Sequence, residues 1–247
     1  MTSTDRKLSV VGSEVEQGAG TLVAVCGVCG GAGASTVAYL VARSAARAGG
    51  PVLVCDTGGV AGGLAECAGV ESAVSLPALA DAVTAGEAPA EGLFAHGGDG
   101  LRVIARGPRF ELPLDAAGMV RVLADARGAH ALSVVDCGVP AGGCEEVVLA
   151  AATHLVWVLP ATPGGARRAR RLLSLFSADA ARREVVVARA QAAEGRAHTE
   201  ELAALAVDRR APLVLMPHVP DLGERGPEAG LEAAALSLDA IRAVLHR

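Results

Sequence analysis

The chain has 247 residues, of which 51% are hydrophobic, 2% are aromatic and 20% are charged, and its formal net charge is −5. That length and apolar content suffice for one large α/β domain with its own core, and no apolar run reaches the ~20 residues that span a bilayer. The scarcity of aromatic rings and the acidic balance argue against stacking on single-stranded nucleic acid and against general nucleic-acid binding, so we expect no specific nucleic-acid partner.

Residues 1–20 are polar and punctuated by glycine, which predicts a flexible N-terminal tail. This segment lacks the charged start, the apolar stretch and the cleavage site of a signal peptide. Six cysteines in a chain of this kind are expected to be reduced thiols rather than a disulfide framework. These features together predict a cytoplasmic protein.

From residue 21 onward, apolar runs typical of strands alternate with stretches of helical periodicity. Several runs are continuous, as expected for parallel strands that are buried on both faces. The expected strands cover 22–26, 52–55, 101–104, 131–136, 154–159, 184–188 and 213–216. The expected helices cover 35–48, 76–85, 115–127, 144–152, 164–178, 199–207 and 231–246. The alternation predicts one α/β domain over 21–247, with a doubly wound, mostly parallel sheet and helices on both faces.

A glycine-rich turn joins the first expected strand to the first expected helix. Its residues are Gly30, Gly31, Ala32, Gly33, Ala34, Ser35 and Thr36. Glycines let consecutive backbone N–H groups point inward at a helix N-terminus, which makes a nest for phosphate. Ser35 is placed to bind Mg²⁺, and Thr36 to touch an α-phosphate. The position before Ser35, where such loops carry a phosphate-binding lysine, holds Ala34. The alternative is a tight strand–helix turn that binds no ligand.

Two other expected strands end in an aspartate. Asp56 closes the apolar run that begins at Val52, and Asp136 closes the run that begins at Leu132. Carboxylates at the ends of buried strands suit the coordination of Mg²⁺, directly or through water. Either aspartate alone could equally be a helix cap or a turn residue. Together with the glycine loop and Ser35, they predict a site for a nucleotide and its metal ion.

The loop, residues 52–64 and residues 132–140, in this order, resemble the ParA/MinD family of deviant Walker A P-loop ATPases, whose loop pattern is K-G-G-x-G-K-[ST]-T. The segment GVCGGAGAST at 27–36 and the strand and arginine-bearing helix from residue 152 are most similar to the CpaE/TadZ-like branch, which serves Tad pili and includes actinobacterial septum-site-determining relatives. The resemblance covers roughly residues 21–245.

This resemblance implies a ParA/MinD-like P-loop fold with ATP and Mg²⁺ as weakly held ligands. The glycine loop would hold the phosphates, and Ser35, Asp56 and Asp136 would hold the metal ion. It also implies a homodimer and protein partners in a pilus, secretion or division machine. Association with the membrane would be indirect, through recruitment to its inner face by those partners.

Four positions depart from the family pattern. Cys29 stands where a signature lysine reaches the partner's nucleotide, Ala34 where the Walker lysine holds the β- and γ-phosphates, Gly58 where a second aspartate takes part in hydrolysis, and Ala188 where an asparagine often reads adenine. A lysine–phosphate bond contributes roughly 1.5–3 kcal/mol, and a lost transition-state cation costs on the order of 100–1000-fold in rate. We therefore predict a degenerate positioning or assembly factor, a pseudo-ATPase with weak or structural nucleotide binding.

Two other functions stay open. A slow but active ATPase would take a cation from a partner or from the arginines of the helix at 164–178, which are Arg167, Arg168, Arg170 and Arg171; these otherwise form a solvated helix face. A redox or metal protein would use the C-x-x-C pair Cys26 and Cys29 with Cys55 and Cys137. The spacing lacks a second paired motif, so small buried thiols are the expectation.

Two further features are expected to be structural. His218 has no metal-ligand spacing around it and is interpreted as a loop residue, in a loop that borders the base in the ParA/MinD family. The last segment, 231–247, is amphipathic but has few basic residues. A membrane-surface helix needs a richer basic face, so we expect this segment to pack onto the sheet.

Overall fold

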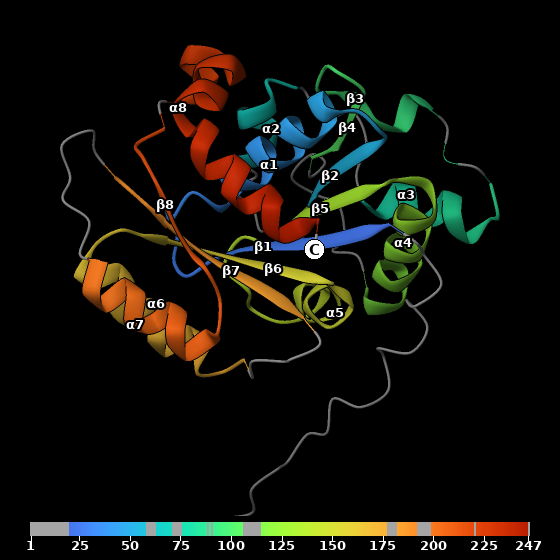
Figure 1. The fold of residues 1–247 in the computed structure, drawn as a ribbon. Helices are drawn as coiled ribbons and strands as arrows, with labels where there is room; N and C mark the ends of the chain where they lie inside the picture. Colours follow the sequence, from blue (N-terminus) through green and yellow to red (C-terminus); the bar gives the residue numbers. More distant parts are fainter. Residues whose placement is uncertain are drawn as a thin grey trace, which may run out of the picture.

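The structure is a computed structural model, and it describes residues 20–57, 63–70, 76–87, 89, 91–105, 115–176, 182–191, 199–219 and 221–246. The expected tail, apart from Gly20, lies outside these residues, as does Gly58. Within them the chain forms an eight-stranded sheet with helices on both faces (Figure 1).

The sheet has the order β3-β4-β2-β5-β1-β6-β7-β8. Its strands are β1 (Thr21–Gly27), β2 (Val52–Asp56), β3 (Ala95–His96), β4 (Leu101–Ile104), β5 (Leu132–Asp136), β6 (His154–Pro160), β7 (Arg183–Arg189) and β8 (Leu213–Met216). All neighbouring pairs are parallel except β3 and β4, which are antiparallel. The strand order reverses on either side of β1, so this is the doubly wound, mostly parallel sheet that the sequence predicts.

The helices form two layers (Figure 1). One layer contains α1 (Ala34–Ala48), α2 (Gly63–Ala68) and α8 (Leu222–Leu245). The other contains α3 (Leu76–Thr84), α4 (Ala116–Ala129), α5 (Cys144–Ala151), α6 (Pro163–Leu173) and α7 (Thr199–Arg209). A short 3-10 turn, η2 (Glu91–Leu93), follows α3. The predicted fold class is confirmed.

The apolar strands are explained by the two layers of helices. Along β1, Leu22 and Ala24 belong to one core cluster, whereas Val23 and Val25 belong to the other. Successive side chains of a strand point to opposite faces of the sheet, so a strand covered on both sides must be apolar at every position. Burial of both faces therefore produces the continuous apolar runs that identify these strands in the sequence.

Some boundaries differ from the prediction, and three short elements, β3, η2 and α2, were not predicted. Helix α6 ends at Leu173 rather than at residue 178. Helix α8 begins at Leu222 rather than at residue 231, because Asp221 caps it and the chain passes through Gly226, at φ 77°, before Pro227. The expectation that the C-terminal segment packs onto the sheet is confirmed, since Leu231, Leu238 and Ile241 are in the core.

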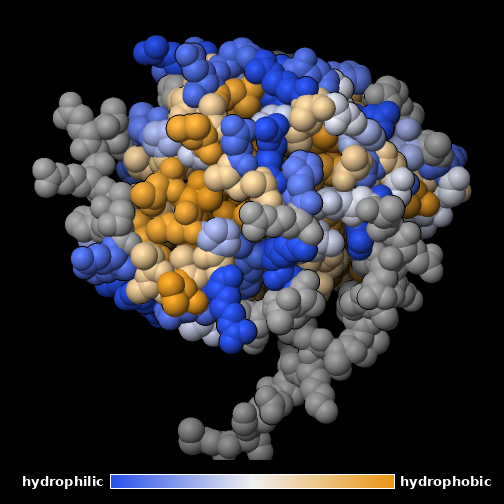
Figure 2. Space-filling model, in the orientation of Figure 1, coloured by the Kyte–Doolittle hydropathy of each residue, from blue (hydrophilic) through white to orange (hydrophobic). Residues whose placement is uncertain are grey.

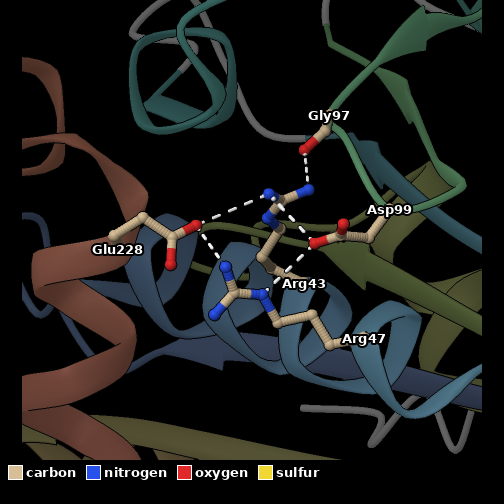
Figure 3. Close-up of polar contacts among 5 residues, drawn as sticks. All are labelled: Arg43, Arg47, Gly97, Asp99 and Glu228. Atoms are coloured by element: carbon tan, nitrogen blue, oxygen red, sulfur yellow. Dashed lines mark hydrogen bonds and ion pairs between the residues drawn. The ribbon is translucent and has the colours of Figure 1, made fainter.

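Two arginines of α1 connect this helix to the β3–β4 turn and to α8 (Figure 3). Arg43 donates to the carbonyl oxygen of Gly97, and its Nη2 lies 3.1 Å from Asp99 Oδ2 and 3.6 Å from Glu228 Oε1. Arg47 pairs with the same two carboxylates. These contacts hold the N-terminal part of α8 beside α1.

The surface on one side of the molecule carries an apolar patch. Figure 2 shows hydrophobic residues gathered in the region of β8 and the neighbouring part of α8. The large exposed apolar side chains on these elements are Leu215 and Leu236. None of the helices in the described ranges is both long and apolar enough to cross a membrane.

Candidate functional site

A cavity of about 640 Å³ opens at the carboxyl ends of the parallel strands. Its floor is the glycine loop between β1 and α1, and its walls come from the ends of β2, β5 and β7, from α2 and from the connection between β8 and α8. Ligands of open α/β sheets bind at this edge, where the strand order reverses. All seven loop residues that the sequence singles out, 30–36, line this cavity.

The backbone of the loop requires glycine at two positions. Gly31 and Gly33 have φ values of 73° and 93°, in the left-handed region that residues with a Cβ disfavour. Gly33 is the N-cap of α1 and, because it has no side chain, it caps none of the N–H groups of this helix end. The first turn of a 15-residue helix therefore presents its positive end to the cavity.

The three residues predicted to hold a metal ion lie together. Asp56 and Asp136 are register partners on the neighbouring strands β2 and β5, and both residues line the cavity wall. The hydroxyl of Ser35, on the first turn of α1, donates to Asp136. The backbone N–H of Gly138 donates to the same carboxylate, at 3.1 Å from Oδ1. Three chain segments that are far apart in sequence thus meet at one point.

The environment of Asp136 fits a cation. The side chain is 1% exposed, and burial raises the pKa of its carboxyl group, while the hydrogen bonds from Ser35 and Gly138 act in the opposite direction. A cation would offset the cost of this buried negative charge. Carboxylate and hydroxyl oxygens are ligands that Mg²⁺ accepts. The residues therefore fit Mg²⁺.

The acidic groups do not form a complete metal cage. Among the described residues, no group of three or more histidine, cysteine, aspartate or glutamate side chains could hold a metal ion. Mg²⁺ typically keeps several waters and binds through one or two carboxylates together with substrate phosphates. The pair Asp56 and Asp136 with Ser35 suits that mode of binding.

The positions that depart from the family pattern have different surroundings. The Ala34 side chain is buried and faces Gly27 beneath the loop. Cys29 is half-buried and lines the cavity. Ala188 is 1% exposed and packs in the core with Val186. None of these three places a charge in the cavity.

The end of β7 contributes a cation, Arg189, that the sequence analysis did not identify. Arg189 lines the cavity, and its guanidinium lies against the α-carbon of Gly33: a Cβ on that glycine would overlap Nη1 and lie 2.9 Å from Cζ. Nη2 donates to the carbonyl oxygen of Val219 at 3.4 Å. The available signal was a charged residue that closes an apolar strand, as Asp56 and Asp136 also do.

The arginines considered as a substitute cation are elsewhere. Arg167, Arg168, Arg170 and Arg171 are exposed on α6 and are not among the residues that line the cavity. Arg170 donates to the carbonyl oxygen of Glu201 on α7. Their exposure agrees with a solvated helix face rather than with a role in this cavity.

The cysteines show no sign of a redox or metal site. Cys26, Cys55 and Cys137 are buried and all cysteines of the described residues are free. Burial raises the pKa of Cys55 to about 12, and a hydrogen bond with Cys26 together with burial raises that of Cys137. Because the thiolate is the reactive form, these surroundings favour inert packing groups.

The cavity contains further charged and polar groups. Glu66 of α2, Asp221 at the start of α8 and His218 line it. His218, expected to be a loop residue, lies in the β8–α8 connection. Together with Asp56 and Asp136 there are four carboxylates, and among the described lining residues one guanidinium, that of Arg189. An anion would enter this acidic cavity most favourably together with a cation.

Comparison with solved structures identifies the fold. The chain is similar to a ParA family ATPase from Chlorobium tepidum TLS, with 18% identity, a TM-score of 0.68 and coverage of 92% of this chain and 97% of that chain. It is also similar to the MinC:MinD cell division complex of Aquifex aeolicus, with 15% identity, a TM-score of 0.69 and coverage of 92% and 96%.

A third similar structure is the septum site-determining protein MinD from Pyrococcus horikoshii OT3 complexed with Mg-ADP, with 16% identity, a TM-score of 0.67 and coverage of 88% of this chain and 93% of that chain. No protein-family model matches the chain, and no curated protein sequence matches it. At these identities the similarity establishes the ParA/MinD P-loop fold.

Proposed function

We propose that this chain binds a nucleotide with Mg²⁺ in the cavity and acts as a ParA/MinD-like positioning or assembly factor that hydrolyses ATP little or not at all. The observation that carries the proposal is the meeting of Ser35, Asp56 and Asp136 beside an uncapped, glycine-lined helix end. A metal-binding set next to a phosphate nest serves no purpose in packing, since buried carboxylates are costly.

The chain's own residues would divide the work of binding. The loop N–H groups of α1 would face the phosphates, and Ser35, Asp56 and Asp136 would hold Mg²⁺. When bound, the metal ion would neutralise phosphate charge that the acidic cavity would otherwise repel. The N–H groups and the carboxylate pair are fixed by the sheet and by α1, so binding requires little rearrangement.

Hydrolysis would lack most of its cations. Cys29 and Ala34 supply no charge at two loop positions where the ParA/MinD family has lysine. Each missing transition-state cation costs on the order of 100–1000-fold in rate. Binding is less sensitive, because the nest and the metal site are retained. Nucleotide would then act as a structural ligand or as a switch for dimerisation.

The partner is proposed to be a protein. One similar structure is a complex of MinD with MinC, and the loop 27–36 resembles the CpaE/TadZ-like branch. Both support a role in a pilus, secretion or septum-site system. Recruitment to the inner face of the membrane would then occur through such partners.

Titration calorimetry of the full chain with ATP and ADP, with and without Mg²⁺, tests the proposal, together with a phosphate-release assay. We expect Mg²⁺-dependent binding, loss of binding in Asp136→Ala, and turnover close to the buffer blank. Robust turnover that Asp136→Ala abolishes would contradict the pseudo-ATPase assignment and favour the slow-ATPase alternative. Failure of the wild-type chain to bind either nucleotide would contradict the proposed function itself.

A further inference from the structure

Arg189 is half-buried, and it differs from two buried arginines in the groups that it faces. Arg43 and Arg209 are both nearly buried, and each meets carboxylates: Asp99 and Glu228 in the first case, Glu184 in the second. A buried guanidinium normally needs such a partner, because removing a charge from water is costly.

Arg189 has no carboxylate partner among the described residues. Its Nε is buried and has no hydrogen-bond partner there, and Nη2 makes the long contact with the carbonyl oxygen of Val219. Burial lowers the pKa of Arg189 and the one nearby group that opposes this effect is the thiol of Cys67. Arginine nevertheless stays protonated in proteins, so a half-buried positive charge stands in the cavity wall with no carboxylate partner among the described residues.

The position of this charge is informative. The guanidinium lies against Gly33, the last loop residue before α1, and Gly33 has no side chain that would keep it away. The loop's own lysine position is Ala34, whose methyl group faces Gly27 beneath the loop. Arg189 reaches the loop from β7, which is separated from β1 by β6.

We propose that Arg189 is the phosphate-binding cation of this loop and replaces, from a different strand, the lysine that position 34 lacks. The inference rests on the proposed nucleotide-binding function of the same cavity. A guanidinium has five donors in a planar fork and can bind phosphate oxygens in a bidentate manner. A phosphate in the nest would supply the counter-charge that the described residues do not.

Phosphate binding by Arg189 can be distinguished by experiment from two other roles, which are a purely structural contact and a contact with the base or the ribose. If Arg189 only connects the loop to Val219, its replacement would change the stability of the protein and would not change affinity according to the charge of the ligand. A group that contacts the base or the ribose would affect nucleosides and leave inorganic phosphates unaffected. The decisive comparison is therefore between Mg-pyrophosphate, Mg-ATP and adenosine.

The test uses calorimetric titration of the full chain in four forms: wild type, Arg189→Gln, Arg189→Lys and Arg183→Gln. Arg183 is exposed at the opposite end of the same strand and serves as the matched control. We expect Arg189→Gln to weaken Mg-pyrophosphate and Mg-ATP by ~10- to 100-fold and to leave adenosine unchanged. Arg189→Lys should retain most of the affinity, and Arg183→Gln should behave as wild type.

Thermal unfolding without ligand completes the test. Arg189→Gln should melt at or above the wild-type temperature, because it removes a half-buried charge that has no carboxylate partner among the described residues. A marked drop in melting temperature, together with equal losses of affinity for all three ligands, would assign a purely structural role to Arg189 instead. Unchanged affinity for pyrophosphate would also overturn the role of Arg189. If the wild type binds no phosphate compound at all, both the proposed function and this inference fail. If the wild type binds phosphate compounds and Arg189→Gln binds them equally well, only this inference fails.

Discussion

Asp56 and Asp136 are register partners on adjacent parallel strands, so their carboxylates lie side by side in the cavity wall. They are 3% and 1% exposed. Two buried acids in neighbouring positions repel each other and are poorly solvated. The two adjacent carboxylates therefore destabilise the ligand-free protein, and a bound cation would offset their charge.

Replacing Asp136 by asparagine should therefore stabilise the ligand-free chain at neutral pH. Burial raises the folded-state pKa of Asp136 above its ordinary value of 3.8. A raised carboxyl pKa means that the folded state binds more protons than the unfolded state, so stability falls as the pH rises through this window. The melting temperature of Asp136→Asn should exceed that of wild type at pH 7, and the difference should vanish as the pH approaches 3.8.

The same variant should lose Mg²⁺-dependent nucleotide binding, which separates stability from function in one protein. Melting curves of both forms between pH 4 and pH 8 provide the measurement. A lower melting temperature for Asp136→Asn at pH 7 would show that the charge stabilises the fold and that the Asp56–Asp136 pair has another role.

Ser35→Ala should weaken Mg-ATP binding by at least ~10-fold, because the variant removes a metal ligand and the hydroxyl that donates to Asp136. Ser44→Ala, further along α1 and remote from the cavity, is the matched control and should bind as wild type. Calorimetric titration at fixed Mg²⁺ measures both. Equal affinities for the two variants would remove Ser35 from the site.

Gly33→Ala should lower the free energy of unfolding by about 1–2 kcal/mol, since alanine must adopt the left-handed backbone conformation at φ 93° and its Cβ would displace the Arg189 guanidinium. Gly30→Ala is the control in the same loop. A Cβ there meets nothing within 4 Å and requires no positive φ. Its effect should stay within about 0.5 kcal/mol. Urea unfolding measures the free energy of unfolding of both variants. Similar losses of stability in the two would contradict a specific requirement for glycine at position 33.

Glu184→Ala should be the most destabilising of these changes, at about 3–5 kcal/mol. Glu184 is buried, pairs with Arg209 at 2.5 Å and accepts a hydrogen bond from Trp157 Nε1 at 3.1 Å. Its removal leaves a buried guanidinium without its carboxylate. The control, Glu232→Ala, changes an exposed residue of α8 and should be nearly neutral. A small effect for Glu184→Ala in urea unfolding would mean that Arg209 finds another partner or solvent.

Arg43→Ala should lower the melting temperature more than Arg47→Ala does, although both arginines face Asp99 and Glu228 (Figure 3). The Arg43 side chain is 10% exposed and also donates to the carbonyl of Gly97, whereas Arg47 is 41% exposed. Exposed ion pairs contribute little because water and salt screen them. Equal shifts in a thermal scan, or a larger one for Arg47→Ala, would contradict this ranking.

Much of the fold could be predicted because burial imposes a pattern on the sequence. The strands at β4 and β8 have the predicted bounds, and the other predicted strands differ by one or two residues. The two-residue β3 and the six-residue α2 are too short to show a period. The start of α8 was missed because Gly226 and Pro227 interrupt the helical pattern, although Asp221 caps the helix before them.

The sequence alone is enough to predict those parts of the site that lie at the ends of strands and helices with a clear pattern. The glycine loop, Ser35, Asp56 and Asp136 are found in this way, because parallel strands bring their carboxyl ends to one edge. Which cation faces that loop follows from the three-dimensional arrangement of the strands. Arg189 and Gly33 are more than 150 positions apart, and their contact depends on the order of β1, β6 and β7 in the sheet and on the absence of a side chain at Gly33. Local sequence patterns indicate whether a residue is buried, whereas the residues that it contacts depend on the order of the strands in the sheet.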